Sequence, residues 1–211
     1  MSNFVITIAR QYGSGGRTIG QMFADKMGIS FYDKDIIRRT SDESGVNIQL
    51  FHKVDENSTG LKTGGFLSKA KGLYTGNVIS PSSRDFTSDD NLFNLQAQTI
   101  KHLAEEEACV IIGRCSNYIL RDYPHVLSVF IHASMDYRLE KAAGKLSMTE
   151  KEIVKFLQKD DKRKEDFSMR YTGKRWTDAT GYDLCLDSSK LGYDKCVEEI
   201  EAYLKIRFPE L

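Results

Sequence analysis

The sequence predicts an α/β fold in which a central parallel sheet carries helices on both faces. An apolar run at 4–9 leads through a glycine-rich stretch into apolar residues at helical spacing. Two further runs, 109–112 and 126–131, are continuous and rich in β-branched residues, as in strands buried on both faces of a parallel sheet. Helical patterns separate these runs. In such a fold, ligands bind at the carboxyl ends of the strands.

The composition indicates one domain without a strong field of either sign. The chain has 211 residues, with 30 Lys and Arg against 30 Asp and Glu, a length that suits a single α/β domain. We therefore expect no nucleic acid or membrane partner and only a local anion site. No apolar run approaches the roughly 20 residues of a membrane span, and no signal sequence is recognisable, so we expect a cytoplasmic protein.

The glycine-rich stretch 10–18 (RQYGSGGRT) predicts a phosphate site. Glycines allow backbone N–H groups to converge on an anion, and the following helix adds the positive end of its dipole. Against the P-loop pattern G-x-x-x-x-G-K-[ST], Gly16 and Thr18 are in register, whereas Gln11 and Arg17 replace the first glycine and the lysine. The alternative is a glycine-rich turn without a ligand.

The next elements predict a βα rhythm interrupted by an insert. Gly28 ends the first helix, a short strand covers 29–32, and the segment from Asp33 to Asp35 caps a helix that reaches about Ser44. From His52 to Asp90 glycines alternate with Ser and Thr, which predicts a mobile insert or arm. Asp89 or Asp90 then caps a helix that ends near Glu107.

The second half continues the same alternation. The strand at 109–112 stops at Gly113, and Ser134 caps a helix after the strand at 126–131. Ser147 and Glu150 form a capping box that begins a long polar helix reaching about Tyr171. A strand at 182–186 and a helix with an apolar stripe complete the chain, the stripe being Val197, Ile200, Leu204 and Phe208.

Polar residues follow three of the predicted strands. The glycine loop follows the first strand, Asp33 the second and Arg114 the third, so the topology predicts that they meet at one sheet edge. Taken singly, Asp33 could be a helix cap and Arg114 a partner in a surface ion pair.

The long polar helix is also rich in cations. Lys159, Arg163 and Arg170 fall at i, i+4 and i+11 and share a face, which predicts a lid that closes arginines over phosphates. The alternative is a solvated helix held by pairs such as Lys162 with Asp166.

Three stretches carry a resemblance to a known family. Residues 6–37, 109–120 (CVIIGRCSNYIL) and 182–192 (YDLCLDSSKLG) resemble the cytidylate kinase-like family, over nearly the whole chain. The resemblance implies a P-loop NTPase three-layer sandwich with an acceptor-binding insert and a helical lid. It further implies phosphoryl transfer from ATP, with Mg²⁺, to CMP or dCMP. We accordingly divide the single domain 1–211 into segments: core 1–52, 89–146 and 180–211, insert about 53–88, and lid about 147–179.

The resemblance also implies roles for individual residues. Asp33 matches the aspartate that opens the acceptor segment of characterised cytidylate kinases, and Arg39 falls where that segment has its phosphate-binding arginine, with Arg38 as a rival. Gly113-Arg114 resembles their D-G-R-D motif, although Ile112 and Cys115 replace both aspartates, which makes cytosine specificity the weakest inference. Our expected sites are a phosphate cradle (Gly13, Ser14, Gly15, Gly16, Arg17, Thr18), an Mg²⁺ ligand (Thr18), catalytic arginines (Arg17, Arg163, Arg170) and acceptor-binding residues (Asp33, Arg38, Arg39, Arg114).

Other functions remain open at this point. A kinase for another small phosphate acceptor would keep the loop and the lid, and a nucleotide-binding regulator would keep the loop without catalysis. Redox control through Cys109 and Cys115 has less support, because the four cysteines match no metal or redox spacing and reduced thiols are expected. The insert 53–88 could close over the acceptor or pair with a second subunit.

Overall fold

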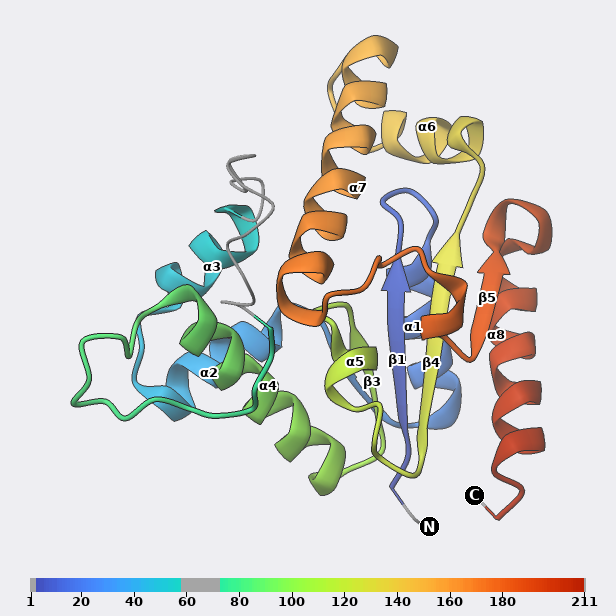
Figure 1. Cartoon of the computed structure of the whole chain (residues 1–211). Coiled ribbons are helices and arrows are strands. Elements are labelled where there is room, and N and C mark those ends of the chain that lie inside the picture. The colour runs from blue at the N-terminus through green and yellow to red at the C-terminus, as the bar shows by residue number, and fades with distance from the viewer. Residues whose placement is uncertain (1–2, 58–72, 211) are drawn as a thin grey trace.

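The computed structural model describes residues 3–57 and 73–210 and confirms the predicted α/β fold (Figure 1). Five strands form one parallel sheet in the order β2-β3-β1-β4-β5. The strands are β1 (Val5–Arg10), β2 (Ser30–Tyr32), β3 (Cys109–Ile112), β4 (Val126–His132) and β5 (Leu184–Asp187). Residues 58–72, the centre of the predicted insert, lie outside the described residues.

Helices cover both faces of the sheet and extend beyond its carboxyl edge. The helices are α1 (Gly16–Met27), α2 (Asp35–Ser44), α3 (Ile48–Asn57), α4 (Asp89–Glu106), α5 (Ser116–Ile119), α6 (Met135–Ala143), α7 (Glu150–Thr172) and α8 (Ser188–Arg207). The core clusters place α1 and α8 on one face of the sheet and α4 and α5 on the other. Helix α7 rises past the end of β1, and α6 crosses above the sheet (Figure 1).

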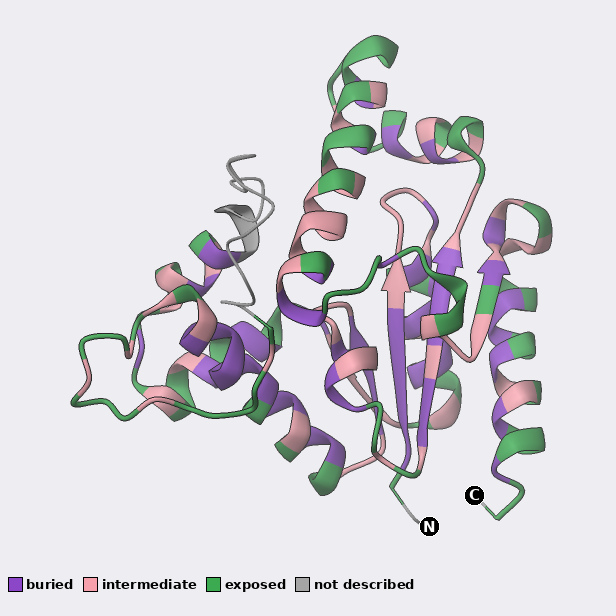
Figure 2. Cartoon of the chain, in the orientation of Figure 1, coloured by how far each residue is buried: buried purple, intermediate pink, exposed green. Residues whose placement is uncertain are grey.

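Alternation along the strands divides the core into two layers. On β1, Val5 belongs to the cluster under α4, whereas Ile6 and Ile8 belong to the cluster under α1 and α8. Because both faces are covered, β3 is buried throughout, as its unbroken apolar sequence predicts (Figure 2). In the described residues, no helix is both long and apolar enough to cross a membrane.

Several predicted helix starts are wrong in detail. The cap of α4 is Ser88, whose side chain accepts from Asn91 N, while Asp89 and Asp90 lie in the first turn. The capping box of α7 is formed by Thr149 and Glu152. Ser88 lies one residue before Asp89, and the pair Thr149 and Glu152 lies two residues after Ser147 and Glu150, so the sequence pattern alone did not distinguish neighbouring capping signals.

The predicted insert is also more ordered at its start than its composition suggests. Helix α3 continues through His52 and ends at Asn57, and its Phe51 and Val54 are buried in the core. The start of α2 differs as well, since Lys34 occupies the cap position without a side-chain bond. Asp33 is therefore available for another role.

Candidate active site

The glycine loop between β1 and α1 has the backbone conformation of an anion cradle. Gly13 and Gly15 adopt φ values of 82° and 78°, which residues other than glycine rarely adopt. Gly15 is the N-cap of α1, and the first turn has neither a side-chain cap nor an acidic residue. Because the first N–H groups of a helix have no intrahelical acceptors, this terminus favours an anion.

Side chains fix the carbonyl groups of the loop, three of them from outside it. Each of four consecutive or near-consecutive carbonyl oxygens accepts a side-chain hydrogen bond: Arg10 O from Lys164 Nζ at 3.1 Å, Gln11 O from Ser14 Oγ at 2.9 Å, Tyr12 O from Arg138 Nε at 2.8 Å, and Ser14 O from Ser188 Oγ at 2.6 Å. Carbonyl oxygens held in this way are kept from an incoming phosphate, which they would repel. The loop is thus preorganised by α6, α7 and α8.

Close packing also explains the glycines. A Cβ on Gly13 would lie 2.7 Å from Arg138 O, and one on Gly15 would overlap the ring of Tyr193. Gln11, which stands where the P-loop pattern has its first glycine, is used differently: its Oε1 accepts a hydrogen bond from Ala133 N at 3.2 Å. That bond ties the loop to the connection between β4 and α6.

Arg17 and Thr18 lie in the first turn of α1. The Arg17 side chain is 63% exposed, with Nε 2.8 Å from Asp33 Oδ2 and its guanidinium 5.3 Å from the Phe31 ring centroid. The side chain is therefore anchored at the end of β2. Thr18 is exposed.

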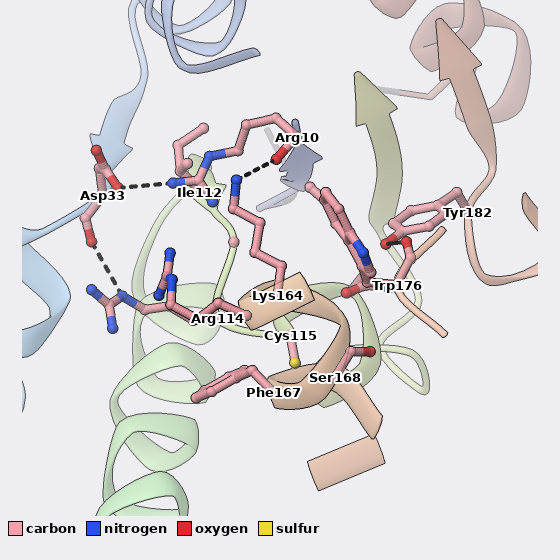
Figure 3. Close-up of a pocket in the computed structure, with 14 residues that line it drawn as sticks. Arg10, Asp33, Ile112, Arg114, Cys115, Lys164, Phe167, Ser168, Trp176 and Tyr182 are labelled. Carbon is pink, nitrogen blue, oxygen red and sulfur yellow. Dashed lines mark hydrogen bonds and ion pairs between the residues drawn. The ribbon is translucent and has the colours of Figure 1, made fainter. Parts of the chain in front are cut away.

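A cavity of about 150 Å³ lies beside the loop, between the carboxyl ends of β1, β2 and β3 and the inner face of α7 (Figure 3). Its cationic lining consists of Arg10, Arg114, Arg163 and Lys164, and Asp33 is its acidic lining residue. Asp160 pairs with Arg163 at 3.0 Å and with Lys164 at 2.6 Å. Four cations therefore face two carboxylates, and the excess positive charge suits an anionic ligand.

Burial and like charges act together on the cations of this cavity. Burial lowers the pKa of Lys164 to about 8, with a further lowering by Arg10 that Asp160 opposes. Burial also lowers the pKa of Arg10; Asp33 and Asp160 raise it, whereas Arg114 and Arg163 lower it. Burial alone would raise the pKa of Asp160, but Lys164 and Arg163 bring it below its ordinary value. An anion placed among these groups would relieve the repulsion.

The end of β3 supplies Arg114 through an unusual backbone. Gly113, Arg114 and Cys115 have φ values of 73°, 57° and 54°, in the left-handed region that costs non-glycine residues free energy. Arg114 donates from Nε to Asp33 O at 3.4 Å (Figure 3). It also donates from Nη1 to Gln96 Oε1 at 2.9 Å. The strained turn is thus held by the residue directly after β2 and by α4, and it directs Arg114 to the cavity.

The opposite wall is aromatic. Trp176 is buried, its ring lies 5.4 Å from Lys164 Nζ, and its carbonyl oxygen accepts from Tyr182 Oη at 2.6 Å. Tyr182 in turn stacks on Phe130 with centroids 5.2 Å apart. Burial raises the pKa of Tyr182 above its ordinary range, so its hydroxyl remains a donor. The cavity therefore has a charged side and a flat apolar side.

The structure brings together some of the expected site residues. Asp33, Arg114 and Arg163 line the cavity, as their positions at strand ends and on the lid helix predict. The others lie elsewhere: Arg39 pairs with Glu43 and Glu106, Arg38 is exposed beside Asp35, and Arg170 pairs with Asp89 and Asp90 at the start of α4. The solvated-helix alternative is also visible in part, in the pair of Lys162 with Asp166.

Sequence reasoning missed four residues of the site. Arg10 and Lys164 line the cavity, and Arg138 and Ser188 hold the loop. Arg10 carried a signal, because a charged residue directly after an apolar strand falls at the carboxyl edge of the sheet. Lys164 belongs to a run of basic residues, and the helical spacing did not distinguish it from its neighbours in that run. Arg138 carried no signal.

No cluster of three or more His, Cys, Asp or Glu side chains that could hold a metal ion is present among the described residues. The four cysteines, all within the described residues, form no disulfide, and burial raises the pKa of Cys109 to about 12. A thiol with such a pKa reacts slowly, which weakens the redox alternative.

Comparisons with known proteins agree with this geometry. Among solved structures, the chain is similar to an uncharacterized protein from Eubacterium ventriosum ATCC 27560, with a TM-score of 0.68 and 23% identity over 96% of this chain and 99% of that one. It is also similar to shikimate kinase from Bacteroides thetaiotaomicron, with a TM-score of 0.54 and 15% identity over 96% and 98%. A gluconokinase from Sinorhizobium meliloti 1021 gives a TM-score of 0.52 and 15% identity over 96% and 92%. At these identities the likeness shows the fold, which is a kinase-like P-loop fold.

A search of the curated proteins finds no match. The model of the cytidylate kinase-like family matches residues 5–190, which include the glycine loop, the strained turn after β3 and helix α7. The chain therefore belongs to the cytidylate kinase-like family.

Proposed function

We propose that the protein transfers the γ-phosphoryl group of ATP to a nucleoside monophosphate, with CMP or dCMP as the acceptor. The observation that carries the proposal is the adjacency of two anion sites: a backbone cradle at the glycine loop and a cationic cavity one residue away, at Arg10. Phosphoryl transfer needs two phosphates brought in line and their charge neutralised, and little else.

In the donor site, Gly13, Ser14, Gly15 and Gly16 would receive the β-phosphate through backbone N–H groups. Arg17 would add a charge from the first turn of α1, since its terminal nitrogens extend beyond the Nε bond to Asp33. The clamps on the loop carbonyls mean that this geometry exists before the donor arrives. Preorganised donors of this kind lose little free energy in reorganising as charge develops.

The site fits Mg²⁺ in the way that nucleotide kinases use it. The exposed Thr18 hydroxyl would provide the protein ligand, and phosphate oxygens and water the remainder, because Mg²⁺ commonly binds with few protein groups. The ion would supply neutralisation of the phosphate charge.

In the acceptor site, Arg114 and Arg163 would hold the phosphate of the monophosphate in the cavity. An oxygen of that phosphate forms a bond to the γ-phosphorus while the bond from the γ-phosphorus to the β–γ bridging oxygen breaks, and ADP leaves. The attacking oxygen is already ionised, so the step requires no strong base. The flat wall formed by Trp176 would pack against the planar or ribose part of the acceptor.

A panel of acceptors tests the proposal. ADP release is measured with Mg²⁺-ATP and each of CMP, dCMP, UMP, AMP, GMP and cytidine, and ³¹P NMR identifies the product. CMP or dCMP should give a nucleoside diphosphate, and cytidine should not. Gly15→Ala, purified in the same way, controls for contaminating kinases. Turnover of none of the monophosphates would overturn the assignment, and tight ATP binding without turnover would favour a regulator.

A kinase for a hydroxyl acceptor is the second candidate. Asp33 places a carboxylate in the wall of the cavity, where it could accept the proton of an attacking hydroxyl. The structural neighbours named shikimate kinase and gluconokinase share only the fold. Asp33 Oδ2 already accepts from Arg17 Nε at 2.8 Å, and Oδ1 lies 3.8 Å from Arg10 Nη2, so both carboxylate oxygens face arginines and not an open position for a hydroxyl. Adding shikimate and gluconate to the panel separates the two candidates.

A further inference from the structure

Arg10 connects the donor cradle with the acceptor cavity. It is the last residue of β1 and the residue directly before the loop, and its side chain is 28% exposed. A Cβ on Gly16, at the start of α1, would lie 2.5 Å from Arg10 Cβ, and a Cβ on Gly113 would overlap Arg10 Nη1. Two glycines from separate elements thus leave room for this side chain, which passes from the loop to the end of β3 (Figure 3).

The surroundings of the Arg10 guanidinium favour an anion. The distance from Nη2 to Asp33 Oδ1 is 3.8 Å, and Asp33 Oδ2 already accepts from Arg17 at 2.8 Å. Arg114 and Lys164 lie on the same side of the cavity. Because Asp33 also pairs with Arg17, its single negative charge does not neutralise Arg10, Arg114 and Lys164, whereas a dianionic phosphate would.

We propose that Arg10 is a substrate-binding residue that contacts the acceptor's phosphate and makes the enzyme select phosphorylated acceptors over the corresponding nucleosides. The inference rests on the proposed function and goes beyond it, because the family resemblance assigns this role to Arg39 or Arg38, which lie outside the cavity. The forked guanidinium suits two phosphate oxygens, a geometry that lysine cannot reproduce.

The test separates acceptor binding from donor binding. Calorimetry first measures the affinity for ADP. With the glycine loop saturated by ADP, the protein is then titrated separately with CMP, cytidine and inorganic phosphate. In Arg10→Gln we expect CMP and phosphate to bind about 10- to 100-fold more weakly, the range for losing a charge-assisted hydrogen bond, with cytidine unchanged. Arg10→Lys should recover part of the loss. Arg121→Gln, an exposed arginine outside the cavity, is the matched control and should bind as wild type.

Equal binding of phosphate and CMP by wild type and Arg10→Gln would overturn the inference, as would an equal loss for cytidine. Phosphate binding that depends on Arg10 without any CMP binding would support it while the proposed acceptor fails. If Arg10→Gln does not fold, the Nε–Hε resonance of wild-type Arg10, assigned from its absence in Arg10→Lys, provides the second measurement. A shift on adding phosphate supports the inference, and no shift overturns it.

Discussion

The two proposed anion sites of this protein, the donor cradle and the acceptor cavity, are built by different means. The donor cradle is made of backbone from one short segment, and side chains of α6, α7 and α8 only hold its carbonyl oxygens. The acceptor cavity is made of charged side chains from β1, α7 and the turn after β3. Backbone sites have fixed shape and little net charge, whereas side-chain sites have charge that can be retuned by single substitutions. We therefore expect substitutions to change the donor site abruptly and the acceptor site by degrees.

The largest expected effect follows from the backbone of the donor site. Gly15→Ala places a Cβ against the Tyr193 ring at a residue with φ of 78°, so the loop cannot keep its shape. We expect ADP affinity and turnover to fall by at least about 100-fold, as for losing several converging donors. Gly28→Ala is the control: φ is also positive, at 64°, but nothing lies within 4 Å, so ADP affinity should be retained. Calorimetry with ADP checks both variants.

A large effect on stability is expected at the clamp of the loop. The Arg138 side chain is 3% exposed, and its guanidinium donates from Nη1 and Nη2 to Asp161 at 2.8 and 2.9 Å. Arg138→Met leaves Asp161 without its partner, and breaking such a buried pair costs about 3–5 kcal/mol. The free energy of unfolding in urea measures the loss. Arg175→Met, at an exposed pair with Glu165, should cost less than about 1 kcal/mol. Equal losses in the two variants would contradict the assignment.

The acceptor site should respond to pH through Lys164, whose pKa is about 8. Between pH 7 and pH 9 the protonated fraction falls about tenfold, so acceptor affinity should fall by up to about tenfold. Unfolded lysine keeps its proton to about pH 10.5, so the unfolded state binds more protons between the two pKa values. The free energy of unfolding should therefore rise with pH in that window.

The control for this pH dependence is chosen from the same helix. Lys164→Met should remove both pH dependences, whereas Lys162→Met, at a side chain that is 71% exposed, should leave them unchanged. Acceptor affinity that stays constant from pH 7 to pH 9 in the wild type would show that Lys164 does not contact the acceptor.

The smallest effect is expected at Arg17. Its side chain is largely exposed and shared with Asp33, so Arg17→Ala should lower turnover by about three- to tenfold. A loss below about threefold, or roughly 0.7 kcal/mol, would show that Arg17 is not the cation of the loop. Single-turnover measurements at saturating ATP separate this effect from weaker binding.

The fold could be predicted because each strand and helix has a local signal. The run at 109–112 has the composition of a strand buried on both faces, and Gly28 has an open left-handed conformation suited to ending a helix. At the start of α4, Ser88, Asp89 and Asp90 are all suitable N-cap residues. The local sequence therefore does not determine which of them is the N-cap, and tertiary packing does.

The candidate site was only partly predictable, for a related reason. The glycines and the strand-end residues Asp33 and Arg114 follow from topology. Whether Arg10 and Lys164 line the cavity depends on the rotamer of Arg10 and on which face of α7 points inward. The sequence does not determine that face, because α7 has lysines and arginines in nearly every turn. Arg39 falls at the family's spacing, but Glu43 and Glu106 hold it on another surface.

The hydrogen bond from Ser188 Oγ to Ser14 O joins residues that are 174 positions apart. Together with the contact of Tyr193 on Gly15, it means that the donor loop acquires its final shape only when α8 has packed. During synthesis the glycine loop leaves the ribosome early, and it reaches its final conformation only after most of the domain has been synthesised. Contacts between such distant positions slow folding. A nascent chain lacking α8 should therefore fail to bind nucleotide.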